Sequence, residues 1–290
     1  MCDTCGCNIT PGNEHLISQG GKLEKTDSGR EAITVLHGLL HENDHTALHN
    51  REHFNAHKVV VINLMSSPGA GKTALLEATI KALGNEFRIA VIEGDLETEN
   101  DAERIRSHGV PAVQITTGSA CHLDAHMVHD AVHQLELSKL DIVFVENVGN
   151  LVCPASFDLG QHKNIVLLSI PEGDDKPAKY PVMFRTADMV MLSKADLLPV
   201  LDDFSPTRAE TYLRNLASAA PLIRTSAKSG DGLELWLQWL RDSVAQVRLD
   251  MESAPVAREH HHHHGHGHEH EHEHEHHHHG PGPQHSSGHS

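Results

Sequence analysis

The segment Ser66-Ser67-Pro68-Gly69-Ala70-Gly71-Lys72-Thr73 has the residue types and spacing of a phosphate-binding loop. It follows an apolar run and opens a helical pattern, and its glycines let backbone N–H groups approach phosphate oxygens at the helix N-terminus. We expect Lys72 to reach the β- and γ-phosphates and Thr73 to bind Mg²⁺. Ser66 stands where the general pattern has glycine. The other residues expected along the nucleotide are Gly69, Ala70, Gly71 and Ala74.

Base recognition is expected from two later loops. Ser193-Lys194-Ala195-Asp196 is similar to the Asn/Thr-Lys-x-Asp motif that selects guanine, with Ser193 in place of the usual Asn. Guanine presents two adjacent donors, N1–H and the N2 amino group, which one carboxylate accepts together, whereas adenine has no N1–H. By itself this pattern would fit a helix N-cap aspartate better. The later Ser226-Ala227-Lys228 resembles the second base-contacting loop of GTPases, and the two loops together favour GTP over ATP.

Carboxylates end the second and fourth apolar runs. In Glu93-Gly94-Asp95 we expect Asp95 to hold Mg²⁺ directly or through water, and Asp101 is a second acid on the same segment. Glu146-Asn147-Val148-Gly149 stands where GTPases carry Asp-x-x-Gly, and two roles are open to Glu146: a contact to the metal ion or to the attacking water. The structural alternative for each acid is a solvated carboxylate at a strand end. The catalytic candidates are Lys72, Thr73, Asp95 and Glu146.

The chain begins with the metal-binding pattern Cys2-x-x-Cys5-Gly-Cys7. Short loops bring three thiolates together at little entropic cost, and the amine of Cys2 becomes a fourth ligand if Met1 is removed. A flat S₃N set suits Ni²⁺, while Zn²⁺ prefers a tetrahedral site. A redox role for Cys-x-x-Cys is disfavoured, because no strand precedes it and no helix follows it.

A second set of metal ligands is predicted beside the nucleotide site. Cys121-His122 and Cys153-Pro154 each lie just after a nucleotide-proximal strand. His126 is expected on the same helical face as His122, four residues away, and thus able to join the site. The alternative is two buried structural cysteines.

Histidine is unusually abundant, with 29 residues, 16 of them from His260 to His289. Glu269, Glu271, Glu273 and Glu275 interrupt that tail, which fits an affinity tag poorly and favours an imidazole buffer for several ions. A second pattern places a histidine every four residues on an expected helix, either as a ladder of transfer sites or as a solvated face. Its members are His37, His41, His45, His49, His53 and His57.

The 290 residues divide into three regions by composition. We predict a Cys-rich metal-binding tip with a flexible linker over 1–42, a GTPase domain over 43–249 and a disordered His-rich tail over 250–290. In the middle region, apolar runs alternate with helical stretches, which indicates βαβ units and a mostly parallel sheet. The runs are Val59–Met65, Arg88–Glu93, Ala112–Thr116, Asp141–Glu146, Ile165–Ile170, Met189–Leu192 and Leu222–Thr225. The expected helices are Asp44–His57, Lys72–Leu83, Thr98–His108, His122–Leu135, Arg208–Leu216 and Leu233–Val247.

Charge and composition exclude some classes of protein. A net charge of −17 argues against a non-specific nucleic-acid binder, which needs a basic face. No apolar run approaches the ~18–20 residues of a membrane span. Without a signal-peptide pattern the expected compartment is the cytoplasm, where clustered cysteines bind metals more often than they form disulfides.

On these residues, the chain resembles the HypB family of hydrogenase nickel-incorporation GTPases. The matching segments are Ser66–Thr73, Glu93–Asp95, Cys121–Asp124, Glu146–Asp158 and Ser193–Asp196. The resemblance implies a three-layer P-loop fold of the SIMIBI type and a homodimer linked to nucleotide. It implies an interface metal site of Cys121, His122 and Cys153, with Ni²⁺ or Zn²⁺. It also implies nickel delivery, with the HypA metallochaperone, to the large subunit of [NiFe]-hydrogenase.

Three alternatives remain beside this hypothesis. The urease nickel GTPase carries a Cys-Pro-His motif and no cysteine tip, whereas here His122 directly follows Cys121. A metal-storage protein with a vestigial GTPase is disfavoured by the intact Lys72 and Asp196. A zinc-homeostasis GTPase fits too, since cysteine and histidine ligands also suit Zn²⁺.

Overall fold

The computed structural model describes residues 30–95, 99–118 and 120–253, with the backbone alone for 30–39. All seven predicted apolar runs are strands: β1 (Val60–Ser66), β2 (Ile89–Asp95), β3 (Ala112–Thr116), β4 (Ile142–Glu146), β5 (Lys163–Ser169), β6 (Met189–Ser193) and β7 (Leu222–Arg224). The helices are α1 (Arg30–Ala56), α2 (Lys72–Leu83), α3 (Asn100–Arg106), α4 (Ala125–Val132), α5 (Lys176–Lys179), α6 (Pro181–Arg185), α7 (Pro206–Asn215) and α8 (Leu233–Ser253).

The strands form one parallel sheet in the order β3-β2-β4-β1-β5-β6-β7. β1 lies at its centre with every residue buried, as expected for a strand covered on both faces. Because the strands are parallel, all of their carboxyl ends meet at one edge of the sheet, where ligands bind in open α/β folds. This edge therefore collects the loops that carry the predicted site residues.

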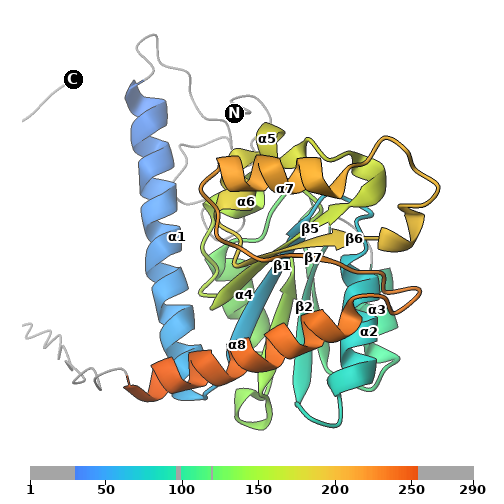
Figure 1. Ribbon diagram of the computed structural model, residues 1–290. Helices are drawn as coiled ribbons and strands as arrows, with labels where there is room; N and C mark the ends of the chain where they lie inside the picture. The colour runs from blue at the N-terminus through green and yellow to red at the C-terminus, as the bar shows by residue number, and fades with distance from the viewer. Residues whose placement is uncertain (1–29, 96–98, 119, 254–290) are drawn as a thin grey trace, which may run out of the picture. The chain divides into compact units, whose positions relative to one another are not determined.

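Helices cover both faces of the sheet, which gives the predicted three layers. Val60 and Ile62 pack with α2, α3 and α8, whereas Val61, one residue out of phase, packs with α1 and α4. The same second face continues over β5 and β6 under α6 and α7. Figure 1 shows α1 beside the sheet and α8 crossing it on the other side. The predicted α/β fold is confirmed.

Helix α1 begins at Arg30, inside the segment predicted to be a flexible linker up to residue 42. The linker prediction was wrong for this part, because residues 30–42 are mostly good helix formers and the single Gly38 costs only about 1 kcal/mol. The described part of α1 buries Asn43, Ala47, Asn50 and Phe54, a helical i, i+4, i+7, i+11 stripe. Tertiary packing of this stripe thus helps to hold the helix.

Two other helix boundaries differ from the prediction. The helix predicted to start at His122 begins at Ala125, because Asp124 is extended (φ −113°, ψ 172°) and its side chain caps the amide of Met127 at 2.8 Å. The last helix extends to Ser253, past the predicted end at Val247 and the predicted tail boundary at residue 250. Among the described residues, no helix combines the length and the apolar character needed to cross a membrane.

Candidate functional site

The loop between β1 and α2 forms one end of a cleft at the carboxyl edge of the sheet. Gly71 is left-handed (φ 97°) at the N-cap of α2, a conformation that glycine adopts without steric cost. Lys72 Nζ lies 3.2 Å from Ser66 Oγ and 3.8 Å from Glu146 Oε1. Thr73 Oγ1 donates to the same Glu146 oxygen at 3.0 Å. Both predicted phosphate-site side chains therefore converge on the end of β4.

The ends of β2 and β4 form the rest of this phosphate cleft. Its lining consists of Pro68, Gly69, Gly71, Lys72, Thr73, Ala74, Glu93, Gly94, Asp95, Asp101, Arg104, Glu146, Asn147, Val148 and Gly149. All four catalytic candidates and most of the predicted nucleotide-loop residues are among them. The strand-to-helix geometry fits an anionic ligand, since the first residues of α2 line the cleft and the first amides of a helix have no partner within the helix.

Three carboxylates meet in this cleft. Glu93, Asp101 and Glu146 each offer an oxygen, and these oxygens lie within 4.8 Å of one another. Glu93 and Glu146 are register partners on β2 and β4, so the parallel pairing itself places them side by side. Burial and the Glu146 charge raise the pKa of Glu93 to about 11, and burial also raises the pKa of Glu146. Without a cation, the pair therefore holds a proton at neutral pH.

This acid cluster fits a hard cation such as Mg²⁺. One oxygen each of Glu93 and Glu146 is buried without a hydrogen-bond partner among the described residues. The Thr73 hydroxyl, already hydrogen-bonded to Glu146, supplies a neutral oxygen nearby. Mg²⁺ prefers oxygen ligands of this kind.

Asp95, expected to hold Mg²⁺ directly or through water, is part of the same cleft. Asp95 lines the cleft, but the close carboxylate group is formed by Glu93, Asp101 and Glu146. The sequence patterns missed Glu93 as a site residue. The sequence does contain an indication of its role. Glu93 directly follows the apolar run Ala90-Val91-Ile92, and a charged side chain buried there needs a partner.

A second pocket adjoins the phosphate cleft and collects the predicted base-binding residues. It is lined by Ala70, Gly71, Ala74, Leu75, Leu167, Ser193, Lys194, Asp196, Leu197, Thr225, Ser226, Ala227 and Lys228. The two pockets share Gly71 and Ala74. A nucleotide can therefore lie with its phosphates at the β1–α2 loop and its base between the β6 and β7 loops.

Hydrogen bonds hold the base pocket together. Ser226 Oγ donates to Asp196 Oδ1 at 2.7 Å, which fixes the carboxylate that the sequence predicts to read guanine. Ser193 Oγ donates to the carbonyl of Ala70 at 2.7 Å and so ties the base loop to the phosphate loop. Lys194 is left-handed (φ 58°) between them. Ser193, which replaces the usual Asn of the motif, thus has a structural role of its own.

Glu172, beyond β5, is a further site residue that the sequence patterns did not indicate. Ser67 Oγ donates to its carboxylate, and burial raises the pKa of Glu172. The contact joins the phosphate loop to the segment that follows β5. No spacing motif marks such a residue, because only the sheet brings the two segments together.

Cys121, His122 and Cys153 form a compact group of metal-ligating atoms. The Sγ atoms of Cys121 and Cys153 are 3.1 Å apart, and Cys121 Sγ lies 3.9 Å from His122 Nδ1. The buried His122 ring stacks on Phe157 with centroids 3.9 Å apart. Its Nε2 has no hydrogen-bond partner among the described residues. Two sulfurs and one imidazole suit borderline-soft ions such as Ni²⁺ and Zn²⁺.

Burial changes the acid–base properties of this group. It raises the pKa of the Cys121 thiol to about 11, together with the neighbouring Cys153, and lowers the pKa of His122 to about 4. The imidazole is therefore neutral, as a ligand must be, and the Cys121 thiol keeps its proton until a cation displaces it.

His126 does not lie with these ligands. The prediction rested on a helical i, i+4 relation to His122, and that relation is absent because His122 precedes α4. His126 Nε2 instead lies 3.1 Å from Thr46 Oγ1 of α1. The described structure therefore brings together three of the four predicted ligands.

Asn147 connects the phosphate cleft to the cysteine and histidine group. Its Oδ1 accepts the amide of Leu123, the residue after His122, at 3.2 Å and that of Val148 at 3.0 Å. Its Nδ2 donates to Asn63 Oδ1 at 3.3 Å. Asn147 also directly follows Glu146, which accepts from Thr73. Asn147 therefore joins the end of β4 to the backbone beside His122.

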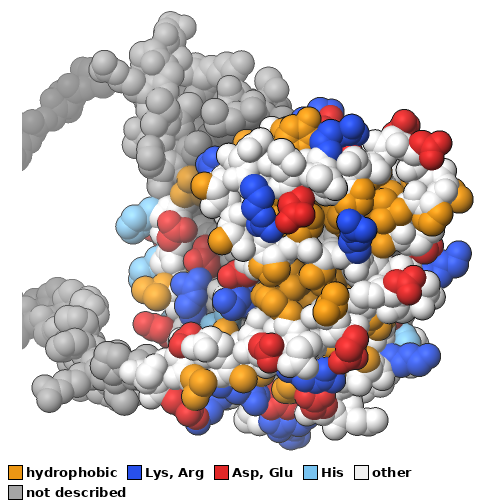
Figure 2. Space-filling view, in the orientation of Figure 1, with side chains coloured by type: hydrophobic (Ala, Val, Ile, Leu, Met, Phe, Trp, Pro, Cys, Tyr) orange, Lys and Arg blue, Asp and Glu red, His pale blue; other side chains and the backbone are white. Residues whose placement is uncertain are grey.

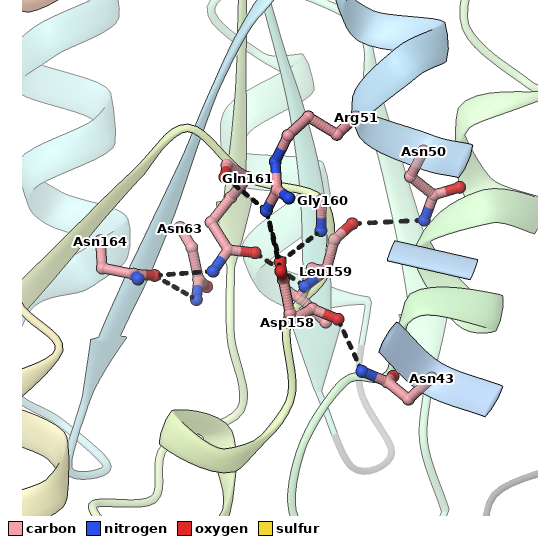
Figure 3. A network of polar contacts seen from close by, with 9 residues as sticks. All are labelled: Asn43, Asn50, Arg51, Asn63, Asp158, Leu159, Gly160, Gln161 and Asn164. Atoms are coloured by element: carbon pink, nitrogen blue, oxygen red, sulfur yellow. Dashed lines mark hydrogen bonds and ion pairs between the residues drawn. The ribbon is translucent and has the colours of Figure 1, made fainter. Parts of the chain in front are cut away.

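The same polar network reaches α1 (Figure 3). Asn63 and Gln161 both donate to Asn164 Oδ1, each at 3.1 Å. Arg51 of α1 donates to both carboxylate oxygens of Asp158, at 2.8 and 2.9 Å. The segment 158–161 follows the Cys153 turn, so α1 stabilises the loop that carries Cys153.

A family model described as "CobW/HypB/UreG, nucleotide-binding domain" matches residues 60–224. The hydrogenase maturation factor HypB of Azotobacter chroococcum mcd 1 is 49% identical over 221 residues, 75% of this chain and 72% of that protein. This chain belongs to the HypB family. The hydrogenase/urease maturation factor HypB of Helicobacter hepaticus is 44% identical over 252 residues, 84% of this chain and 98% of that protein.

Solved HypB structures share the fold. HypB from Helicobacter pylori in complex with nickel is 44% identical, with a TM-score of 0.68 over 71% of this chain and 97% of that one. HypB from Archaeoglobus fulgidus is 37% identical, with a TM-score of 0.66 over 70% and 98%. The family resemblance is thus confirmed in sequence and in three dimensions.

Some predicted HypB-type features lie outside the described residues. They are the Cys2, Cys5 and Cys7 tip and the histidines of the tail from His260 onward. The structure describes side chains only from residue 40 onward. His37, the first histidine of the ladder, therefore also lies outside the described side chains.

Proposed function

We propose that this protein is a GTP-hydrolysing nickel metallochaperone for the large subunit of [NiFe]-hydrogenase. GTP binding at the carboxyl edge of the sheet controls a nickel site formed by Cys121, His122 and Cys153. Support comes from HypB relatives called hydrogenase maturation factors and from a HypB structure in complex with nickel. The delivery partner implied by the family is the HypA metallochaperone.

The base pocket supports GTP as the nucleotide. Asp196 is held by Ser226 with its carboxylate in the pocket, where it can accept both guanine donors. Adenine would leave this acceptor incompletely satisfied, at a cost of about 1–3 kcal/mol for a polar group left unpaired. Lys194 lines the same pocket, and its stem can cover the base.

The phosphate cleft supports hydrolysis. Thr73, Glu93, Asp101 and Glu146 are the residues that would hold Mg²⁺, an ion that neutralises charge developing on the β- and γ-phosphates. Lys72 exchanges its contacts with Ser66 and Glu146 for phosphate oxygens. The Glu146 oxygen that would not hold Mg²⁺ can orient water at the γ-phosphate once Lys72 has left the carboxylate. Arg104, the arginine in the lining of the phosphate cleft, is bound to Glu77 and Asp101, so we expect slow unaided hydrolysis.

The single observation that carries the coupling is the position of Asn147. It follows Glu146 of the phosphate cleft and accepts the amide of Leu123 beside His122. When Thr73 and Lys72 leave Glu146 for the nucleotide, the end of β4 loses two contacts and can move with Asn147. Such a movement changes nickel affinity only if the ion prefers one arrangement of Cys121, His122 and Cys153.

A second copy of the chain completes this proposal. Three ligands leave a nickel or zinc ion with at least one open position. Val152, next to Cys153, is 55% exposed, which places an apolar side chain on the surface beside the ligands. A homodimer that buries this surface would bring two sets of ligands together. Zn²⁺ competes for the same donors, and the Cys2, Cys5 and Cys7 tip and the His-rich tail would serve as additional nickel stores.

The test uses the thiolate-to-nickel charge-transfer absorption of the full-length protein, which imidazole ligands do not produce. Nickel is titrated with GDP and with a non-hydrolysable GTP analogue. We expect the nickel affinity to differ between the two nucleotides in the wild type and in the matched control Cys2→Ser, and the difference to vanish in Cys121→Ser. If the nickel affinity of the wild type is the same with GDP and with the GTP analogue, the coupling is refuted.

A GTP hydrolysis assay separates this function from metal storage alone. The wild type should hydrolyse GTP, and Lys72→Ala should lose the activity while keeping its thermal stability. A wild type without hydrolysis would favour a storage protein that has retained only the nucleotide fold.

A further inference from the structure

Histidines of α1 and α4 face one another outside the nucleotide and cysteine sites. We call them the α1–α4 histidine cluster: His49 and His53 on α1, His57 just after the end of α1, His129 on α4, and His133 at the C-cap of α4. The ring centroids of His49 and His129 are 5.3 Å apart, and those of His53 and His133 are 6.2 Å apart. Figure 2 shows histidine side chains at the edge of the molecule where α1 lies.

Within this cluster, His129 and His133 already have chelating geometry. Their Nε2 atoms are 3.1 Å apart. Two imidazole nitrogens bound at 2.0–2.1 Å to one ion lie about 2.9–3.4 Å apart for bond angles between a right angle and a tetrahedral one. The pair therefore needs little rearrangement to bind a cation. Its spacing of four residues on one helix face explains the approach.

Asn50 of α1 fixes the orientation of the His129 ring. Asn50 Nδ2 donates to the carbonyls of Ala125 and Leu159, at 2.8 and 3.2 Å, so the amide can turn only its oxygen toward His129. His129 Nδ1 lies 3.0 Å from that oxygen and must donate to it. The lone pair of neutral His129 is then on Nε2, toward His133. A hydrogen bond of this kind, on the other ring nitrogen, is typical of metal-binding histidines.

The remaining members are suited to act as ligands. Burial, and then the neighbouring histidines, lower the pKa values of His53 and His129, which keeps both rings neutral at pH 7. His53 is half-buried between His57 and His133, so a side-chain rotation would bring it toward the pair. Neutral imidazoles suit Ni²⁺, Cu²⁺ and Zn²⁺ and not Mg²⁺.

We propose that His129 and His133, with His53 as a third ligand, form a binding site for a late first-row divalent cation. When the ion binds, His133 gives up the Nε2 proton that it donates to His129 and takes its other tautomer. The ion then joins α1 to α4 through side chains. This site is separate from the Cys121, His122 and Cys153 group and does not depend on nucleotide.

The experiment is histidine footprinting of the full-length protein with diethyl pyrocarbonate, read peptide by peptide by mass spectrometry. Metal buffers fix the free Ni²⁺ concentration, so the His-rich tail does not deplete it. His41 and His45 are the internal control, because they have the same spacing on α1 but are exposed, and none of the described contacts orients them. We expect His129 and His133 to be protected at a free Ni²⁺ concentration at least tenfold lower than His41 and His45.

Two variants distinguish coordination from simple covering of the surface. In His133→Gln, the nickel-dependent protection of His129 should disappear. In His53→Gln, it should require several-fold more free Ni²⁺, whereas the matched variant His45→Gln should change nothing. The proposal would be overturned if His129 and His133 were protected at the same free Ni²⁺ concentration as His41 and His45. It would also be overturned if Ni²⁺ still protected His129 in His133→Gln. Mg²⁺ should protect neither pair.

Discussion

The backbone amide of Leu123 donates a 3.2 Å hydrogen bond to the side chain of Asn147. Leu123 follows His122 of the proposed metal site and Asn147 follows Glu146 of the phosphate cleft, so this bond joins the two sites. Asn147→Ala should reduce the effect of nucleotide on nickel affinity at Cys121 at least severalfold. It should also cost about 1–3 kcal/mol in unfolding free energy, because two buried amides lose their acceptor.

The control for this variant is Asn147→Asp, which keeps the acceptor oxygen for Leu123 and Val148 and replaces the Nδ2 donor to Asn63 with a second oxygen. It should retain most of the nucleotide effect in the same nickel titration. A folded Asn147→Ala protein with an undiminished effect would show that the coupling takes another route.

Asp196→Asn should change the base preference of the pocket. An amide accepts guanine N1–H but cannot accept the N2 amino group as well, and the charge-assisted bonds are lost. We expect GDP to bind roughly 10–100-fold more weakly, corresponding to about 1.5–3 kcal/mol. Xanthine has a carbonyl at C2, to which the new amide can donate, so XDP should bind better than in the wild type. Competition binding measures both, and Asp231→Asn, an exposed acid on the β7 loop, should change neither.

Glu93→Gln should stabilise the nucleotide-free protein while weakening its binding of Mg²⁺ and nucleotide. The folded pKa of Glu93, about 11, is above its ordinary value of 4.5. The wild-type carboxyl therefore contributes fully to stability only below about pH 4.5, and the contribution declines as the pH rises toward the folded pKa. A neutral glutamine avoids this loss.

The measurement is the difference in unfolding free energy between Glu93→Gln and the wild type. It should grow from pH 5 to pH 9 and reach at least about 1 kcal/mol at pH 7. Glu103→Gln, at an exposed position of α3, should show no such trend. A difference that stays constant with pH would mean that Glu93 is charged in the free protein.

Protonation of His162 should contribute to the loss of stability at low pH. Its Nδ1 accepts the amide of Val61 at 2.9 Å, and burial lowers the pKa of His162 from 6.5 to about 4. Because the folded pKa is depressed, the stability is present above pH 6.5 and is lost as the pH falls toward 4. The loss is at most about 3 kcal/mol. In His162→Asn, which keeps an acceptor for Val61, urea unfolding should depend less on pH over this range. The same dependence as in the wild type would exclude His162 as a source.

Gly149→Ala should separate the two walls of the phosphate cleft. A Cβ at Gly149 would lie 2.7 Å from Pro68 Cα and 2.8 Å from Pro68 N, and backbone atoms cannot turn aside as a flexible side chain can. We expect GTP hydrolysis to fall at least about tenfold, corresponding to 1.4 kcal/mol, with the sheet still folded. Single-turnover hydrolysis and thermal unfolding measure the two effects. Normal hydrolysis would mean that the Gly149 loop moves away from Pro68 when nucleotide binds.

The sequence by itself determined the strands, the nucleotide loops and the family. Runs such as Val59–Met65 are apolar because β1 is buried on both faces, and this signal is local. The loop Ser66–Thr73 and the motif Ser193–Asp196 are also local, since each must present its own backbone or side chain at one strand end. Features that depend only on neighbouring residues can be predicted from a single sequence.

The tertiary structure alone decided which distant side chains meet. Glu93 pairs with Glu146 because β2 lies beside β4, an order that the chain does not follow in sequence. His126 lies against α1 and away from Cys121, because Asp124 starts the helix three residues later than predicted. His129 lies beside His49 because α4 packs on α1. Periodicity indicates only which residues share a face of one element, whereas these contacts depend on how separate elements pack in the folded chain.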